Sequence, residues 1–215
     1  MEFEIVSINV GKVKTDHYRG NEIQTGIYKK PVEGRVYVSS LNIAGDEQAD
    51  LLNHGGKDKA ILMYPHQHYS YWTKKLGVSL QPGAFGENLT ISGLNEDNTC
   101  IGDVFELGEI LVQVSLPRQP CYKLANKMNQ DKLPLNIKDT GFSGFYFRVL
   151  KEGYIEPGQT VKLVERHREQ ITVSFVNKVK YHDKSNQVAL TRLVNLSVLS
   201  DDWRSSFQER LKTLI

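Results

Sequence analysis

The stretch DVFELGEILVQVSL, residues 103–116, predicts a β-hairpin and sets the class of fold. Apolar residues dominate both of its halves, and the central Leu107-Gly108-Glu109 offers a turn. Similar short segments surround it at residues 3–10, 34–40, 60–64, 87–94 and 145–166. We interpret the last of these as a second hairpin, because Glu152-Gly153 and Pro157-Gly158 punctuate it. Many short strands with regular turns favour a barrel or a sandwich over a doubly wound sheet.

The pattern changes near residue 170, where helical spacing replaces short strands. No glycine or proline follows Ile171. Two apolar stripes recur at helical spacing, one of Val173, Val176 and Val179 and one of Leu190, Leu193, Val194 and Val198. Ser200-Asp201-Asp202 is a candidate N-cap for a last helix, and two earlier helices are expected at residues 66–76 and 122–128. We therefore predict a mainly β domain with some α-helix over residues 1–168, followed by a small helical domain over residues 169–215.

Charge and composition exclude several classes of protein. The formal net charge of +2 is too small to indicate nucleic acid or an anionic membrane as the main partner. No apolar run approaches the roughly 20 residues that a membrane span needs, and the N-terminal stretch MEFEIVSINVGK lacks the order of a signal peptide. We expect a cytoplasmic protein. Two cysteines are too few for a disulfide scaffold, and the histidines do not fall at zinc-finger spacings.

Cys121, in the stretch SLPRQPCYKL at residues 115–124, is the main candidate for chemistry. It follows a predicted strand and two prolines that force the chain out of the sheet. Arg118 and Lys123 flank it, and nearby cations favour the reactive thiolate. An arbitrary cysteine more often only packs in a core, but this setting favours an accessible thiolate. Cys100, which lies among apolar neighbours without a basic residue beside it, is interpreted as packed.

Three further motifs carry polar side chains that suit a binding site. In HGGKDK, Gly55 and Gly56 separate His54 from Lys57 and Lys59, a pattern that fits either an anion-binding loop or a solvated surface turn. In GAFGENL, Glu87 and Asn88 begin a strand; Asn88 suits recognition of a heterocycle edge or an oxo group, or caps its own backbone. Arg148 lies in an apolar strand and needs either a carboxylate or an anionic ligand.

Together these motifs resemble the MOSC domain, and more closely its YiiM-like branch. The segments that carry the resemblance are GDEQAD, HGGKDKA, YPHQHYSYW, GAFGENL, IGD at 101–103, PRQPCYKL and TGFSGFYFRVL, and they span roughly residues 1–165. The helical tail resembles the three-helix module that follows the MOSC domain in this branch. The resemblance implies a MOSC-type β-barrel and a molybdenum cofactor, a pterin with a phosphate and an ene-dithiolate. It also implies that Cys121 is the protein ligand of the metal.

The reaction that the resemblance implies is reduction of N-hydroxylated bases, such as N-hydroxylaminopurine, to the amine. Cofactor-binding candidates are cations and backbone groups: Lys12, His54, Gly55, Gly56, Lys57, Lys59, Arg118, Lys123 and Arg148. Asn88 or Glu87 is the candidate for orienting substrate or carrying a proton. No flavin, haem or iron–sulfur motif is evident, so a separate electron-donor protein is expected. Two alternatives remain: a non-catalytic carrier of the cofactor or its sulfur, and a metal-free thiol redox protein.

Overall fold

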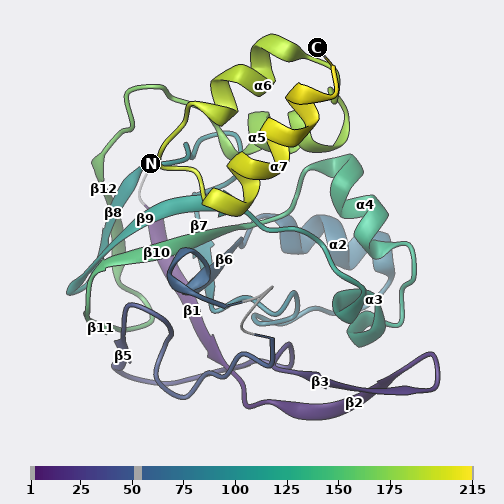
Figure 1. The fold of residues 1–215 in the computed structure, drawn as a ribbon. Coiled ribbons are helices and arrows are strands. Elements are labelled where there is room, and N and C mark those ends of the chain that lie inside the picture. The colour runs from purple at the N-terminus through teal and green to yellow at the C-terminus, as the bar shows by residue number, and fades with distance from the viewer. Residues whose placement is uncertain (1–2, 51–54, 215) are drawn as a thin grey trace.

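Seven strands close into a β-barrel in the computed structural model, which describes residues 3–50 and 55–214. The strand order is β12-β8-β9-β10-β6-β7-β1, and pairing of β12 with β1 closes the ring (Figure 1). The bounds are β1 Phe3–Val10, β6 Ile61–Pro65, β7 Leu89–Ser92, β8 Val104–Leu107, β9 Ile110–Pro117, β10 Phe145–Lys151 and β12 Thr160–Glu165. β6 and β7 pair in parallel, and the other barrel neighbours are antiparallel. The barrel, rather than the sandwich, is confirmed.

The first predicted hairpin is confirmed, and the second is wrong. β8 and β9 pair directly across the turn at Gly108, which has a φ of 54°. β10 pairs instead with β9 and β6, and β12 pairs with β8 and β1. Between them, β11 (Gly153–Ile155) pairs with β5 (Val36–Val38). Alternation along the chain predicts strands, whereas closure of the barrel decides their partners.

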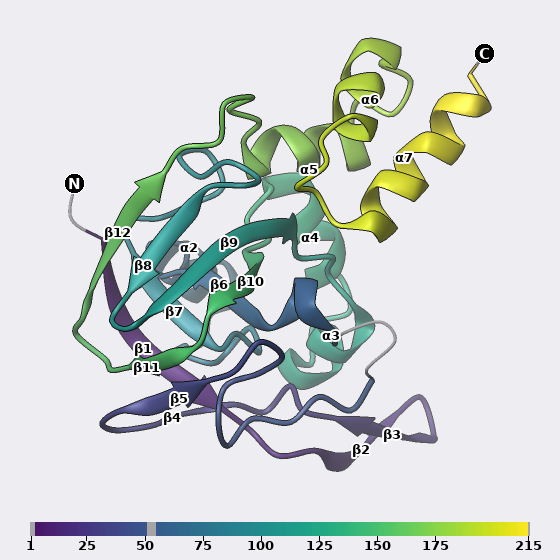
Figure 2. The ribbon, with the colours of Figure 1, turned by 60° about the vertical axis from the view of Figure 1, so that its left-hand side comes forward.

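A polar β-hairpin extends from the barrel beside the site (Figures 1 and 2). It consists of β2 (Lys14–Tyr18) and β3 (Asn21–Thr25), and its turn residues Arg19 and Gly20 both have positive φ. The sequence pattern did not reveal it, because KTDHYRGNEIQT lacks an apolar face. The short β4 (Lys30–Pro31), which follows it, pairs with the end of β1.

Three C-terminal helices pack onto the barrel and share its core. They are α5 (Val173–Tyr181), α6 (Gln187–Val194) and α7 (Asp201–Lys212). The predicted stripe of Val173, Val176 and Val179 is buried in the same apolar cluster as the barrel interior. Ser200 is the N-cap residue of α7, but its backbone N–H donates to the Ser115 carbonyl of β9 at 3.2 Å and its side chain makes no capping bond. This contact places α7 next to the end of β9.

A second, aromatic cluster lies beneath α2 (His68–Leu76), α3 (Tyr122–Met128) and α4 (Leu133–Thr140). Tyr64 stacks on Phe85 with ring centroids 4.2 Å apart, and the Trp72 indole donates to the Tyr64 hydroxyl at 2.7 Å. The predicted helices are confirmed, the first beginning at His68 rather than residue 66, whereas α4 was not foreseen. The cluster supports the loop before β7 and the start of α3, the two segments that carry the site. No described helix is long and apolar enough to cross a membrane.

Candidate functional site

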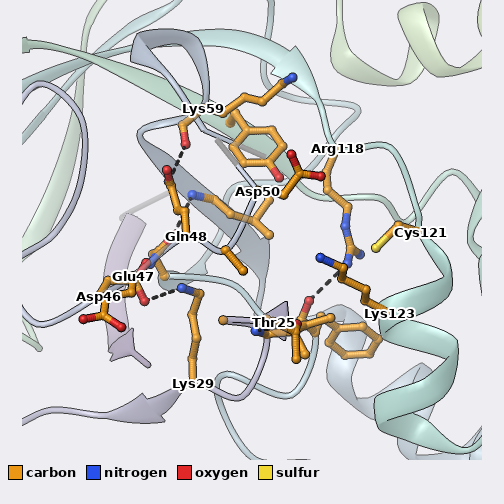
Figure 3. Close-up of a pocket in the computed structure, with 18 residues that line it drawn as sticks. Thr25, Lys29, Asp46, Glu47, Gln48, Asp50, Lys59, Arg118, Cys121 and Lys123 are labelled. Carbon is orange, nitrogen blue, oxygen red and sulfur yellow. Dashed lines mark hydrogen bonds and ion pairs between the residues drawn. The ribbon is translucent and has the colours of Figure 1, made fainter. Parts of the chain in front are cut away.

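A pocket opens where the chain leaves the barrel after β9 (Figure 3). It encloses about 630 Å³ of empty space, part of which is continuous with solvent. Its charged lining residues are the cations Lys29, Lys59, Arg118 and Lys123 and the acids Asp46, Glu47 and Asp50. Cys121, Asn88 and Tyr146 also line it. Six segments far apart in the sequence therefore converge: the exit from β3, residues 46–50, residues 59–62, the loop before β7, the loop after β9 and Tyr146 of β10.

Cys121 is held at the junction between β9 and α3. β9 ends at Pro117, and the Arg118 backbone N–H donates to the Gly144 carbonyl at 3.0 Å, which ties this loop to the start of β10. Cys121 then takes extended backbone angles as the N-cap residue of α3. Its side chain is half-buried and lines the pocket wall together with Arg118 and Lys123 (Figure 3). The thiol is therefore placed beside two cations at a surface that a ligand can reach.

Arg118 is the buried cation of the pocket. Only 4% of its surface is exposed, and its Nη2 donates to the Phe85 carbonyl at 3.2 Å. Its buried Nη1 has no hydrogen-bond partner among the residues that the structure describes. A buried donor without a partner costs about 1–3 kcal/mol, and more when the group is charged. This orphaned guanidinium nitrogen therefore indicates a ligand that accepts hydrogen bonds, such as a carbonyl, a phosphate or another anion.

Asn88 lines the pocket with its amide fixed by the protein. Its Oδ1 accepts from the Leu62 backbone N–H at 3.1 Å, and its Nδ2 donates to Asp46 Oδ2 at 2.9 Å. Asp46 also accepts from the Gly11 N–H at 2.9 Å and forms an ion pair with Lys29. Burial lowers the pKa of Lys29, and the Asp46 carboxylate opposes that shift. Asn88 is therefore part of a rigid polar wall that it forms with Asp46 and Lys29. Neither Lys29 nor Asp46 was predicted from the sequence as a site residue.

Glu87 lies behind this wall, fully buried and outside the pocket lining. Its carboxylate accepts from the Gly83 N–H at 2.9 Å, the Phe85 N–H at 3.0 Å and the Thr90 hydroxyl at 2.9 Å, and also from the Tyr69 hydroxyl. These bonds hold the loop that presents Asn88 and the Phe85 carbonyl. The structure thus gives Glu87 the position of a loop organiser behind the pocket lining.

The other predicted cofactor-binding residues separate into two groups. Lys59 and Lys123 line the pocket. Lys12, the glycines of HGGK, Lys57 and Arg148 do not, and His54 lies outside the described residues. Lys12 is exposed and pairs with Glu47 at 3.0 Å. Arg148 pairs with Asp58 at 2.9 Å and donates to Gln113 at 3.1 Å. Of the two partners expected for Arg148, a carboxylate or an anionic ligand, the structure shows the carboxylate.

Two further residues of this region, Lys127 and Tyr146, carry no prediction from the sequence. Lys127, four residues after Lys123 on α3, donates to the carbonyls of Ile27 at 3.0 Å and Gly83 at 2.7 Å. Its burial lowers the pKa to about 8. Tyr146 lines the pocket, and burial raises its pKa to about 12, so its hydroxyl keeps its proton at neutral pH. The spacing of four residues from Lys123 is a signal by which Lys127 could have been found, whereas no pattern distinguishes Tyr146 from other strand aromatics.

Comparison with known proteins assigns both parts of the chain. Residues 50–162 match the MOSC domain model, and residues 171–214 match the model of the YiiM-like 3-alpha helix domain. The YflK protein of Bacillus subtilis strain 168 is 47% identical over 99% of this chain and 96% of its own length. A protein of Gibberella moniliformis named reductase is 33% identical over 97% of this chain, which corresponds to 37% of that larger protein.

A solved structure agrees with the same assignment. The crystal structure of YiiM from Geobacillus stearothermophilus is 44% identical and superposes with a TM-score of 0.84, over 97% of this chain and 99% of the other. The matched segments include the loop that carries Cys121 and the three C-terminal helices. This chain therefore belongs to the MOSC domain family, as a member of its YiiM-like branch.

Proposed function

We propose that this protein is a molybdenum-cofactor-dependent reductase that converts N-hydroxylated bases, such as N-hydroxylaminopurine, to the corresponding amines. The observation that carries the proposal is the orphaned Arg118 Nη1 beside Cys121 in a pocket with several cations. Family membership and the relative named reductase add support. The overall change is R–NHOH plus two electrons and two protons to R–NH₂ plus water, with the electrons supplied by a separate donor protein.

The residues of the pocket fit the cofactor. The Cys121 thiolate is a soft ligand suited to a sulfur-rich metal shell, and the cofactor supplies there a metal centre that exchanges two electrons. Arg118 offers its unpaired donor to a pterin carbonyl or a phosphate oxygen, while Lys59 and Lys123 add positive charge. Asn88, fixed by Asp46, adds a polar side chain held in place to the pocket lining.

Tyr146 is the group that we assign to substrate orientation. Its hydroxyl stays protonated because burial raises its pKa to about 12, and it lies in the same pocket lining as Cys121. A protonated hydroxyl donates a hydrogen bond to the oxygen of the N–O group as that oxygen leaves as water. Glu87 is given no proton-transfer role, since its described hydrogen bonds are with its own loop, Tyr69 and Thr90 and it does not line the pocket.

Two cysteine variants test the proposal. The protein is purified from a host that makes the cofactor, its molybdenum content is measured by mass spectrometry, and N-hydroxylaminopurine reduction is followed with an artificial electron donor. We expect Cys121→Ser to lose both molybdenum and turnover. Cys100→Ser is the matched control, because Cys100 is buried beside Arg166 and away from the pocket lining. Equal turnover in Cys121→Ser and wild type refutes the proposal.

Two other results identify the alternatives. Stoichiometric molybdenum in the wild type without turnover on N-hydroxylated substrates, given a competent donor, supports a cofactor carrier. Molybdenum-free wild-type protein with a peroxide-reactive Cys121 supports a thiol redox protein. In the second case Cys121→Ser abolishes the reaction with peroxide while the molybdenum content of the two proteins is the same.

A further inference from the structure

A buried carboxylate and a buried histidine face each other behind the pocket. Glu96, in the loop after β7, is 3% exposed, and His68, the first residue of α2, is 6% exposed. Glu96 Oε2 lies 2.7 Å from His68 Nε2. Neither side chain lines the pocket, and the proposed reaction gives neither of them a role. A pair of this kind costs stability unless its remaining polar atoms are also bonded, so its other contacts decide what it does.

The second oxygen of this carboxylate reaches the loop that carries Arg118. Glu96 Oε1 accepts from the Gly144 backbone N–H at 2.7 Å, and the Gly144 carbonyl accepts from the Arg118 backbone N–H at 3.0 Å. Gly144 has a φ of 69°, and a Cβ there would lie 2.5 Å from the Met63 carbonyl oxygen, so this position requires glycine. The bond to Glu96 therefore fixes a flexible residue, which in turn fixes the start of the Arg118 loop.

A second path leads from His68 to the guanidinium of Arg118. The His68 ring packs edge-on against Tyr64, with ring centroids 5.8 Å apart. Tyr64 stacks on the Phe85 ring, and the Phe85 carbonyl accepts from Arg118 Nη2 at 3.2 Å. Both described anchors of Arg118, one on its backbone and one on its side chain, thus lead back to the buried pair.

The pair is itself held by three surrounding elements. The His68 ring stacks on the Phe142 ring with centroids 3.8 Å apart, and the Phe142 carbonyl accepts from the Tyr64 hydroxyl at 3.1 Å. Burial and, after it, the charge of Glu96 raise the pKa of Tyr64 well above its ordinary value, so this hydroxyl keeps the proton that it donates. The Ser174 N–H at the start of α5 donates to the Glu96 carbonyl at 2.9 Å. The pair therefore connects α2, residues 142–144 and the helical domain.

We propose that His68 and Glu96 are positioning residues, which hold Arg118 in place for the group that accepts from its orphaned Nη1. The proposal rests on the proposed function for the identity of that group, a carbonyl or phosphate oxygen of the cofactor. The pair acts through Gly144 and Phe85 and touches neither cofactor nor substrate. A donor that is already held in one orientation loses less freedom when its acceptor binds, so the pair increases the affinity of the pocket.

Substitutions of two buried carboxylates test the proposal. Glu96→Leu removes both bonds of the Glu96 carboxylate. Glu96→Gln keeps both, because its amide oxygen accepts from the Gly144 N–H and its amide nitrogen donates to the His68 ring nitrogen. Asp103→Leu is the matched control. Asp103 is also fully buried and accepts from two backbone N–H groups, at 2.9 Å and 3.0 Å, but its described side-chain bonds involve neither residues 142–144 nor the loop after β9.

Two measurements follow Arg118 and its ligand separately. Hydrogen exchange of the Arg118 backbone N–H is measured by NMR in cofactor-free protein and is expressed relative to the Phe147 N–H of the barrel core, which corrects for global unfolding. Molybdenum per folded protein is measured after purification from a host that makes the cofactor. In Glu96→Leu we expect relative exchange at least about 10-fold faster and at least about 5-fold less molybdenum. Glu96→Gln should stay within about two-fold of wild type in both, and Asp103→Leu should lose thermal stability without either change.

A histidine variant covers the case in which Glu96→Leu does not fold, as judged by circular dichroism. His68→Phe keeps a ring against Phe142 and removes the bond to Glu96, so we expect relative exchange at Arg118 to be at least about 3-fold faster, with less molybdenum. Wild-type exchange, or wild-type molybdenum content, in His68→Phe and in any folded Glu96→Leu refutes the positioning role. Equal changes in Glu96→Leu and Asp103→Leu also refute it. If exchange follows the prediction while the wild type itself binds no molybdenum, the proposed function fails and the positioning of Arg118 stands.

Discussion

Replacing Glu87 by glutamine separates a structural carboxylate from a catalytic one. Glu87 Oε2 accepts from the Phe85 N–H at 3.0 Å, and Oε1 accepts from the Gly83 N–H, the Thr90 hydroxyl and the Tyr69 hydroxyl. In Glu87→Gln an amide group replaces one oxygen, so at least one buried donor faces another donor. That mismatch costs about 1–3 kcal/mol, and loss of the charge weakens the remaining bonds.

We therefore expect Glu87→Gln to lower the free energy of unfolding by about 3 kcal/mol. For a chain of this size each kcal/mol shifts the thermal midpoint by about 2–4 °C, so the midpoint should fall by roughly 6–12 °C. Differential scanning calorimetry measures it at neutral pH. Glu106→Gln is the matched control, because the Glu106 side chain is 46% exposed and lies 3.7 Å from Lys162; an exposed pair contributes at most about 1 kcal/mol.

Activity measured on the same samples decides between the two roles. A positioning role predicts that the loss of stability is accompanied by lower molybdenum retention, because the loop carries Asn88 and the Phe85 carbonyl that Arg118 contacts. The turnover per bound molybdenum should then stay close to that of wild type. An unchanged thermal midpoint together with a large drop in turnover per molybdenum would refute this reasoning and indicate a catalytic role for Glu87.

Two further variants test the electrostatics of the pocket. Burial lowers the pKa of Lys127 to about 8, so between about pH 8 and 10.5 the unfolded chain binds more protons at this residue. The free energy of unfolding of wild type, relative to Lys127→Met, should therefore rise with pH across that window in urea titrations; a constant difference contradicts the shift. Arg118→Met removes an orphaned buried donor, so we expect an unchanged or higher thermal midpoint with at least about 10-fold less bound molybdenum. A lower midpoint with full molybdenum would contradict the role given to Arg118.

Local signals in the sequence predicted those parts of the fold that are fixed by local contacts. The hairpin over residues 103–116 and the helix at Tyr122–Met128 depend on a glycine turn and on a proline break, which lie beside them in the chain. The pairing of β10 with β6 joins residues about eighty positions apart, and no adjacent pattern encodes it. α4 was missed because its apolar residues Leu133 and Ile137 form too short a stripe to stand out.

The candidate site shows the same division between local and long-range information. Proline and basic neighbours identified the loop of Cys121, and the structure places Arg118 and Lys123 beside it in the pocket lining. Arg148 looked equally suited to an anion, yet Asp58, 90 positions away, satisfies it. Charge in a sequence predicts that a partner exists, and the fold alone decides whether that partner belongs to the protein or to a ligand.

Arg118 and Arg148 differ in whether the protein supplies the partners of the guanidinium group. Arg148 is half-buried and its guanidinium has both a carboxylate and an amide oxygen within 3.1 Å. Arg118 is more deeply buried, has one carbonyl contact from its guanidinium and leaves Nη1 without a described partner. Burying a charge with an unpaired donor in this way lowers stability. A bound group that accepts from Nη1 would offset that cost, which is the physical reason for proposing that the pocket next to Cys121 is a ligand site.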